Sequence, residues 1–428
     1  MKHHPIDPSL FTGNRDRLRK LLKPGSVAVI NANDLLPTNA DALLPMCPNS
    51  DLFHLSGIEQ EETILLLAPD AHDKQMREIL FVREPNQLLK TWEGHKHSRE
   101  EATRISGIPT VRWLSEFHGI FHGLMCGAEQ VYLNSNEHRR ASIETETRDA
   151  RFIREVRSRY PLHRLERLAP LMHRIRVVKS PQEIELLQKA VDITAKGFAR
   201  VARFVRPGVN ECEVEAEFAH EFLRNRGKFA YTPIIASGKN SCVLHYNAND
   251  QPCRKGEILL LDVAASYANY NADLTRTIPV GGKFTRRQKE VYNAVLRVLR
   301  SSIKGAVVGK SHADWQLESK EMMNGELLSL GLLKKSELKK KNDGQPACHR
   351  YFMHGLGHPL GLDVHDVAPV EEPFAPGWVL TVEPGIYIPE EGFGVRLEND
   401  ILLREEGPLD LMREIPIEAA EIEELMAR

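Results

Sequence analysis

The sequence has no long hydrophobic run, few cysteines and no marked excess of charge of either sign. Its longest apolar stretches, such as Ile258–Leu261 and Ile64–Ala68, are as long as strands, so we expect no membrane-spanning helix and no membrane partner. The N-terminal MKHHPIDPSL lacks an apolar segment after its positive residues, so no signal peptide is expected. The six cysteines include no CxxC pair, which is typical of free thiols in a reducing cytoplasm. We therefore expect a cytoplasmic protein.

Several motifs that would indicate a function directly are also absent. A formal net charge of −2 gives no electrostatic reason to expect nucleic acid as a partner. The sequence contains neither a GxGxxG fingerprint nor a P-loop, so nothing supports a nucleotide site. His354 and His358 have the spacing of the HExxH zinc motif, but Gly355 occupies the position of its glutamate. Any catalytic chemistry must therefore come from a different set of residues.

The length of 428 residues predicts two domains, because a single core rarely grows that large. The first part of the chain alternates between strand and helix patterns, which favours an α/β layer domain. A capping box with proline at the first helical position, Ser180–Glu183, opens a long amphipathic helix after it. We predict an N-terminal α/β domain over residues 1–173 and a second domain over residues 174–428. The first domain's expected elements are strands at Ser26–Asn31, Glu62–Ala68, Glu78–Arg83 and Gln130–Leu133, and helices at Asn14–Leu22, Arg112–Met125 and Arg151–Arg159.

The second domain reads as a mixture of helices and antiparallel strands rather than a βαβ series, which indicates an α+β fold. Its helix starts are marked by capping residues at Ser180, Asn210, Thr285 and Ser311. The expected strands are Glu257–Ala264, Tyr270–Val280, Val379–Ile388 and Gly394–Leu403. Between the last helix of this series and the last two strands lies the segment Met353–Asp366, MHGLGHPLGLDVHD.

That segment, which we call the ribbon, carries His354, His358 and His365. Its glycines and its proline argue against a continuous helix. The ribbon is therefore expected to be an irregular, turn-rich segment that directs imidazoles at one place. An imidazole can ligate a metal, transfer a proton or bind a substrate. The residues alone leave open which of the three histidines does which.

Two pairs of carboxylates lie in the predicted strands. Asp262 sits in an apolar strand, where a lone buried carboxylate is costly unless it is paired or bound to a cation. The midpoint of Asp262 and Asp273 falls in the apparent turn, so a hairpin would set them opposite each other. Glu383 and Glu398 have their midpoint in a second apparent turn, Pro389–Gly392. Four carboxylates and an imidazole match an oxygen-rich site for two divalent metals.

These residues lie in blocks that resemble a known family. LLLDVAASYANYNADLTRT, HGLGHPLGLDVHD, TVEPGIYI and GVRLEND are similar to the signature blocks of the pita-bread-fold metallopeptidases, which include Xaa-Pro aminopeptidase (aminopeptidase P), prolidase and methionine aminopeptidase. NSDLFHLSG and KTWEGHKHSREEA resemble the N-terminal domain of aminopeptidase P. The resemblance implies a creatinase/prolidase-type N-terminal domain, which would serve substrate access and oligomerisation. The resemblance also implies that a pita-bread catalytic domain follows this domain in the chain.

The resemblance also implies roles for individual residues. Asp262 would chelate one metal, Asp273 and Glu398 would bridge both, and His358 and Glu383 would complete the shell of the second. Glu383 would also accept the proton of the metal-bridging water as it attacks. The other implied roles are His365 as a hydrogen-bond donor to the scissile carbonyl or oxyanion, His354 as lining of the proline pocket, His245 at the scissile peptide or leaving group, Arg396 as a brace of the site, and Trp92 as a contact to a neighbouring subunit's active site.

The function implied is a metal-dependent exopeptidase that releases the N-terminal residue from peptides with proline in the second position, through a metal-bridging hydroxide. Two divalent ions are expected, with Mn²⁺ favoured by the oxygen-rich shell and Co²⁺ or Zn²⁺ as alternatives. The expected partners are Xaa-Pro peptides and further copies of the chain, in a homodimer or homotetramer. One alternative is prolidase, which has the same ligand blocks but cleaves dipeptides. A second is a non-catalytic pita-bread protein that binds peptides; retention of all five ligands argues against it.

Overall fold

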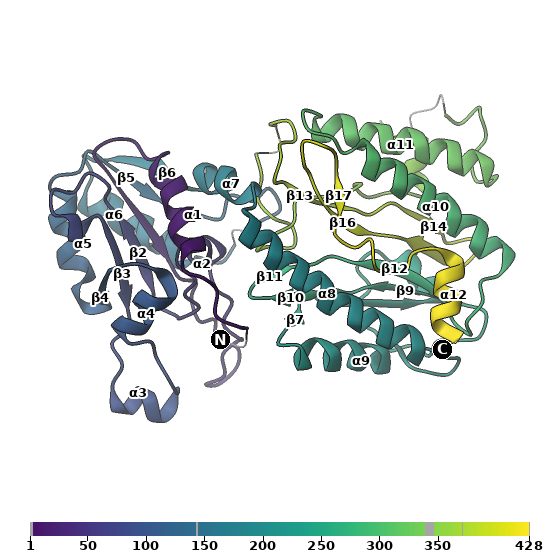
Figure 1. Ribbon diagram of the computed structural model, residues 1–428, viewed down its shortest axis with the longest axis horizontal. Helices are drawn as coiled ribbons and strands as arrows, with labels where there is room; N and C mark the ends of the chain where they lie inside the picture. The colour runs from purple at the N-terminus through teal and green to yellow at the C-terminus, as the bar shows by residue number, and fades with distance from the viewer. Residues whose placement is uncertain (1–2, 143, 339–345, 370, 428) are drawn as a thin grey trace. The chain divides into compact units, whose positions relative to one another are not determined.

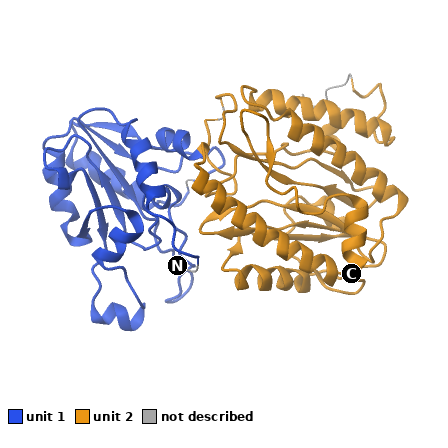
Figure 2. Cartoon of the chain, in the orientation of Figure 1, with its two compact units in different colours: residues 1, 3–176 blue, residues 2, 177–428 orange. Residues whose placement is uncertain are grey.

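The computed structural model describes residues 3–142, 144–338, 346–369 and 371–427. The chain divides into two compact units, which Figure 2 shows in separate colours. Unit 1 comprises His3–Arg176 and unit 2 comprises Val177–Arg428. The division follows Arg176, whereas the sequence pattern alone suggests residue 173.

Unit 1 is built on one six-stranded sheet with strand order β4-β3-β2-β1-β5-β6. β1 pairs antiparallel with β2 and parallel with β5, so the sheet is mixed. All six residues of β1 are buried, and alternate residues enter two different cores: Ala28 and Ile30 face one, Val27 and Val29 the other. Burial on both faces confirms the predicted α/β layer fold. The strands are β1 (Ser26–Asn31), β2 (Ile64–Leu67), β3 (Glu78–Val82), β4 (Thr110–Trp113), β5 (Gln130–Leu133) and β6 (Arg164–Arg167).

The helices of unit 1 correct two predictions. The helix expected over Arg112–Met125 is wrong in its first part, because Thr110–Trp113 pairs with β3 as an edge strand and only α5 is α-helical. The first helix begins at Ser9 and ends at Arg19, ahead of the expected Asn14–Leu22. The helices are α1 (Ser9–Arg19), α2 (Ser50–Ser56), α3 (Gln87–Trp92), α4 (Arg99–Ser106), α5 (Phe117–Met125), α6 (Arg148–Arg159) and α7 (Ala169–Val177).

In unit 2 the capping residues set the helix starts as expected. Ser180, Asn210 and Thr285 each form a complete capping box, and Ser311 accepts from the backbone N–H of Asp314. Figure 1 shows α8 and α9 below β9 and β12, with α10 and α11 above these strands. The helices are α8 (Pro181–Phe204), α9 (Glu211–Arg224), α10 (Arg286–Gly305), α11 (His312–Ser329) and α12 (Ala419–Ala427). No helix in the described ranges has both the length and the apolarity needed to cross a membrane.

The strands of unit 2 form several small sheets instead of long hairpins. Their orders are β11-β10-β7, β12-β9-β8, β13-β16-β17 and β14-β15. The strands are β7 (Lys228–Phe229), β8 (Ile234–Ser237), β9 (Ile258–Asp262), β10 (Ala265–Tyr267), β11 (Tyr270–Asn271), β12 (Thr275–Pro279), β13 (Val379–Val382), β14 (Gly385–Ile388), β15 (Phe393–Arg396), β16 (Asn399–Leu402) and β17 (Leu409–Asp410).

Each of the four long strands predicted from the sequence is broken at or next to its acidic residue. Asp262 is the last residue of β9, and Asp273 lies in the gap between β11 and β12. Glu383 separates β13 from β14, with Pro384 unable to donate to a ladder, and Glu398 separates β15 from β16. A carboxylate at a strand break is not confined to one face of a sheet, so these breaks allow the four side chains to converge.

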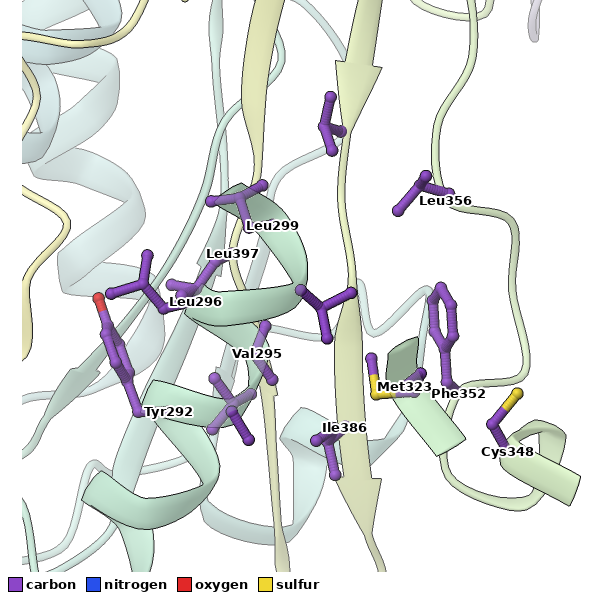
Figure 3. Packing of buried hydrophobic residues seen from close by; sticks show 14 of the residues in the cluster. Tyr292, Val295, Leu296, Leu299, Met323, Cys348, Phe352, Leu356, Ile386 and Leu397 are labelled. Atoms are coloured by element: carbon purple, nitrogen blue, oxygen red, sulfur yellow. The ribbon is translucent and has the colours of Figure 1, made fainter. Parts of the chain in front are cut away.

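A large hydrophobic core supports these strands. Figure 3 shows Tyr292, Val295, Leu296 and Leu299 of α10 gathered beside Ile386 of β14 and Leu397. These side chains are at most 3% exposed. Each fully buried aliphatic side chain contributes on the order of 2 kcal/mol. The core therefore fixes the backbone on both sides of Leu397, which immediately precedes Glu398.

Candidate metal centre

The ribbon Met353–Asp366 contains no helix, as predicted, and it runs alongside β13. Backbone N–H groups of Leu360, Thr381 and Glu383 donate to the carbonyls of Val379, His358 and Leu356, at 3.0, 2.9 and 2.7 Å. In each bonded pair the two residue numbers add up to the same total, as they do when two segments run antiparallel. In this register His358 lies opposite Thr381 and Glu383 lies opposite Leu356, so His358 and Glu383 are diagonal neighbours across the pair. His354 and His365 lie outside these three bonded positions.

Two features hold the ribbon against its neighbours. A Cβ at Gly357 would lie 2.0 Å from the Thr381 carbonyl oxygen, so only glycine permits this close approach. At the far end, Lys179 Nζ donates to Asp366 Oδ2 at 3.1 Å, and both side chains are 1% exposed. A buried pair of this kind is costly to break, because the remaining charge would be left without its partner.

Four donors from distant parts of unit 2 lie together at the ribbon, and a fifth, Asp262, is near enough to act on them through its charge. Ligand atoms of Asp273, His358 and Glu398 all lie within 4.8 Å of one another. His358 Nε2 is 3.4 Å from Asp273 Oδ2 and 3.7 Å from Glu383 Oε1. His358 Nδ1 donates to the Pro359 carbonyl at 2.9 Å, which leaves the lone pair on Nε2 facing the carboxylates. Asp262 joins the group through charge, since its carboxylate raises the pKa of Asp273.

The strand registers confirm one predicted pairing of acids and correct the other. Val382↔Asn399 and Gly385↔Arg396 share one register, and continuing it through the gap sets Glu383 opposite Glu398, as predicted. Asp262, however, pairs with Thr275, so the predicted Asp262–Asp273 pairing is wrong by two residues. The cause is a tight turn in which Ala268 and Asn269 have positive φ, which moves the hairpin's centre.

Arg396 is the cation that organises these acids. Its guanidinium donates to Asp262 Oδ2 at 2.5 Å, to Thr275 Oγ1 at 3.1 Å and to the Tyr387 hydroxyl at 2.8 Å. Thr275 Oγ1 in turn donates to Glu398 Oε2 at 2.6 Å. Arg396 is 4% exposed, so one buried guanidinium links two carboxylates and the tyrosine.

The centre carries more negative charge than its own residues neutralise. Burial, followed by repulsion from neighbouring carboxylates, raises the pKa values of Asp273, Glu383 and Glu398 well above their ordinary range. Asp262 Oδ1 is buried and has no hydrogen-bond partner among the described residues. An oxygen-rich donor set with uncompensated charge and an orphaned carboxylate oxygen fits divalent cations. The residues present therefore fit the expected metal ions.

The other three predicted histidines, His354, His365 and His245, lie around this donor set and differ in their burial and contacts. His354 Nε2 accepts from the Tyr387 hydroxyl at 2.7 Å, and its Nδ1 lies 3.8 Å from Glu383 Oε2. Burial, together with the nearby Arg396, lowers the pKa of His354 to about 3, so its imidazole is neutral. His365 is exposed, and its ring meets that of His358 edge to face at 4.4 Å. His245 is exposed and close enough to His354 to influence its charge.

Several residues at the centre were not singled out from the sequence. The buried Tyr231 hydroxyl lies near Asp262, Asp273 and Glu398; burial and these charges raise its pKa. Asp400 Oδ2 accepts the backbone N–H of Asp273 at 3.0 Å and so fixes that residue. Tyr387 was visible in the block EPGIYI, and Asp400 follows Glu398 in GVRLEND, so both could have been found there. Tyr231 comes from a separate segment and carries no local signal.

A cluster of four buried or half-buried carboxylates and one imidazole, in an α+β unit that follows an α/β unit, is typical of a metal-dependent hydrolase. Comparisons with known proteins name the class. Metallopeptidase family M24 matches residues 185–405, and the aminopeptidase P N-terminal domain matches residues 11–132.

The similarity extends over nearly the whole chain. Xaa-Pro aminopeptidase of Escherichia coli strain K12 is 34% identical, with 97% of each chain covered. Xaa-Pro aminopeptidase 3 of Homo sapiens is 30% identical over 89% of this chain and 76% of its own. A solved structure of zinc-substituted E. coli aminopeptidase P in complex with product has a TM-score of 0.87 at 33% identity, with 99% of each chain covered. This chain belongs to the aminopeptidase P family of metallopeptidases.

The close approach of the ribbon to β13 can be tested at Gly357. Gly357→Ala should move the ribbon away from Thr381, lower stability by about 1–3 kcal/mol and weaken metal binding at least tenfold. Gly355→Ala is the matched control in the same ribbon, because its Cβ would meet only the Gln316 side chain, at 3.4 Å. Thermal unfolding and metal content after dialysis measure both effects. Equal behaviour of the two variants would contradict the register described here.

Proposed function

We propose that this chain releases the N-terminal residue from peptides that have proline in the second position. The proposal is carried by one observation: all five metal-binding side chains expected of this family converge in unit 2. The similar proteins from E. coli and Homo sapiens are named Xaa-Pro aminopeptidases, which supports the same substrate class here. A peptide bond to proline has no N–H, so a peptidase for it cannot depend on hydrogen bonding to that group.

We assign Asp262, Asp273, His358, Glu383 and Glu398 as ligands of two divalent ions. Asp273 and Glu398 would help to hold both ions, Asp262 would hold one, and His358 with Glu383 would hold the other. When bound, the ions lower the pKa of a water molecule and polarise the scissile carbonyl. Mn²⁺ is our first choice because most of the ligands are carboxylates, and Co²⁺ and Zn²⁺ remain alternatives. The zinc-substituted relative indicates that this kind of centre accepts more than one metal.

The chain's own groups then manage the proton and the substrate. Glu383 serves as the base, since its half-buried carboxylate lies 3.7 Å from His358 within the donor set and can accept a proton from a water held there. His365, exposed beside His358, donates to the oxygen of the scissile carbonyl. His245, also exposed, meets the leaving group.

His354 has both ring nitrogens engaged, because Nδ1 donates to the Gly355 carbonyl at 2.8 Å and Nε2 accepts from Tyr387. His354 therefore has no ring nitrogen left to bond the substrate, and it contacts the proline side chain through the face of its ring. Arg396 holds Tyr387 and Asp262 in place during the reaction.

We further propose a homodimer or homotetramer whose contacts involve unit 1. Trp92 and Leu88 lie four residues apart on α3, so they share one face of the helix, and they are 80% and 68% exposed. Large apolar side chains exposed together favour a protein contact. All six cysteines are free, which supports a cytoplasmic location. We expect no nucleic acid or membrane partner.

A small peptide panel tests the substrate class. After loading with Mn²⁺, Co²⁺ or Zn²⁺, the enzyme should cleave Xaa-Pro tripeptides and longer Xaa-Pro peptides, with Mn²⁺ giving the highest kcat/KM. Matched Xaa-Ala peptides should be cleaved at least tenfold more slowly. Cleavage confined to Xaa-Pro dipeptides would support the prolidase alternative. Absence of both cleavage and bindable metal would support a non-catalytic peptide-binding protein.

Two substitutions separate the base from the oxyanion donor. Glu383→Ala should reduce kcat by about 10³-fold or more and weaken metal binding, since it removes a ligand and a base together. His365→Ala should reduce kcat by about 10²-fold with both metals retained. His220, an exposed histidine on α9, provides the control as His220→Ala. Near-normal turnover of Glu383→Ala, or metal loss in His365→Ala, would show that these roles are misassigned.

A further inference from the structure

A second cluster of metal-ligating side chains lies in unit 1, in the segment that joins α3 to α4. Ligand atoms of His95, His97 and Glu101 all lie within 4.8 Å of one another. His95 Nε2 and Glu101 Oε2 are 2.8 Å apart, and a carboxylate can only accept, so Nε2 carries the proton there. None of these three residues belongs to the centre in unit 2.

Contacts on both sides hold the backbones of the three donors in place. Lys96, between the two histidines, pairs with Glu61 at 2.6 Å and with Glu93 at 3.1 Å. The His97 backbone N–H donates to Gln60 Oε1 at 2.8 Å. On the other side, Glu101 is fixed in the first turn of α4 by its capping box with Ser98. Anchored backbones on both sides reduce the ordering needed for an ion to bind.

The three donor atoms lie within reach of one ion, since all are within 4.8 Å of one another. Ligands 2.0–2.2 Å from a tetrahedral metal lie about 3.3–3.6 Å from one another. The 2.8 Å separation of His95 Nε2 from Glu101 Oε2 is shorter than this range, so a bound ion would move these two atoms apart. The side chain of His95 is 66% exposed, which leaves room for this movement. An incoming ion would replace the proton that His95 and Glu101 now share.

The donor set differs in kind from the centre in unit 2. Two imidazoles and one carboxylate suit Zn²⁺, Ni²⁺ or Cu²⁺, whereas a set dominated by carboxylates suits Mn²⁺.

We propose that His95, His97 and Glu101 form a further metal site, which binds one zinc-like divalent ion independently of the centre in unit 2. The ion joins the segment after α3 to the first turn of α4. Because Trp92 ends α3 only three residues before His95, the ion also restricts the motion of the exposed face of α3. One or more coordination positions stay open for water or for a ligand from another molecule.

Zinc stoichiometry of the full chain tests this site. After equilibrium dialysis against Zn²⁺, the wild-type chain should hold one more zinc ion than His95→Ala/His97→Ala, whatever number the centre in unit 2 holds. Glu101→Gln, which preserves much of the helix cap, should weaken the same ion at least tenfold. His118→Ala is the matched control. His118 is 61% exposed and lies 3.6 Å from Glu155, but among the described residues this pair has no third metal-ligating side chain close by.

Hydrogen exchange locates the ion. Zinc should slow amide exchange of residues 87–101 in the wild-type chain and leave the double variant unaffected. His95→Ala alone guards against loss of folding, since this side chain is mostly exposed. Equal zinc content in the wild type and the folded variants, without zinc-dependent protection of this segment, would overturn the proposal and leave a surface ion pair that caps α4.

Discussion

The buried negative charge around Arg396 is the constraint on which the structure of unit 2 depends. Four carboxylates lie in one region, where the guanidinium of Arg396 and the imidazole of His358 face them. Burial raises the pKa of three of these acids, so in the absence of a further cation their ionised forms are strongly disfavoured. Bound divalent ions remove this cost, which links metal binding to the stability of the unit.

The fold creates this concentration of charge by interrupting its strands. Asp273, Glu383 and Glu398 all occupy gaps between short strands, and Asp262 ends one. The core between α10, Ile386 and Leu397 keeps the interrupted strands in register despite the gaps. Gly357 then allows the ribbon to approach β13 closely enough for His358 to complete the set. Hydrophobic packing thus supports a polar arrangement that could not stabilise itself.

Much of this centre could be predicted from the sequence, because spacing along a hairpin determines which residues face each other. The symmetric spacing of Glu383 and Glu398 about a turn gave their pairing correctly. The same reasoning failed for Asp262 and Asp273, since the positive φ angles of Ala268 and Asn269 shift the turn and are not apparent from residue type. The strand breaks at the acids were also missed, because apolar runs on both sides appear continuous.

Contacts between segments far apart in the chain were beyond sequence reasoning. Tyr231 approaches the acids only because β8 pairs with β9, a pairing that no local pattern encodes. The end of the edge strand, Arg112–Trp113, was taken for helix because the strand is short and is followed at once by a 3₁₀ turn, Leu114–Glu116, that leads into α5. The selection of His358 among three histidines depended on resemblance to the family, and it stays a prediction; the structure sets His358 diagonally across from Glu383 in the pairing with β13.

Anomalous diffraction from crystals of the Mn²⁺-loaded protein tests the central claim most directly. The account predicts two manganese peaks in unit 2, about 3.5–4 Å apart and surrounded by Asp262, Asp273, His358, Glu383 and Glu398. Strong peaks elsewhere, with these carboxylates protonated and hydrogen-bonded to one another, would contradict it.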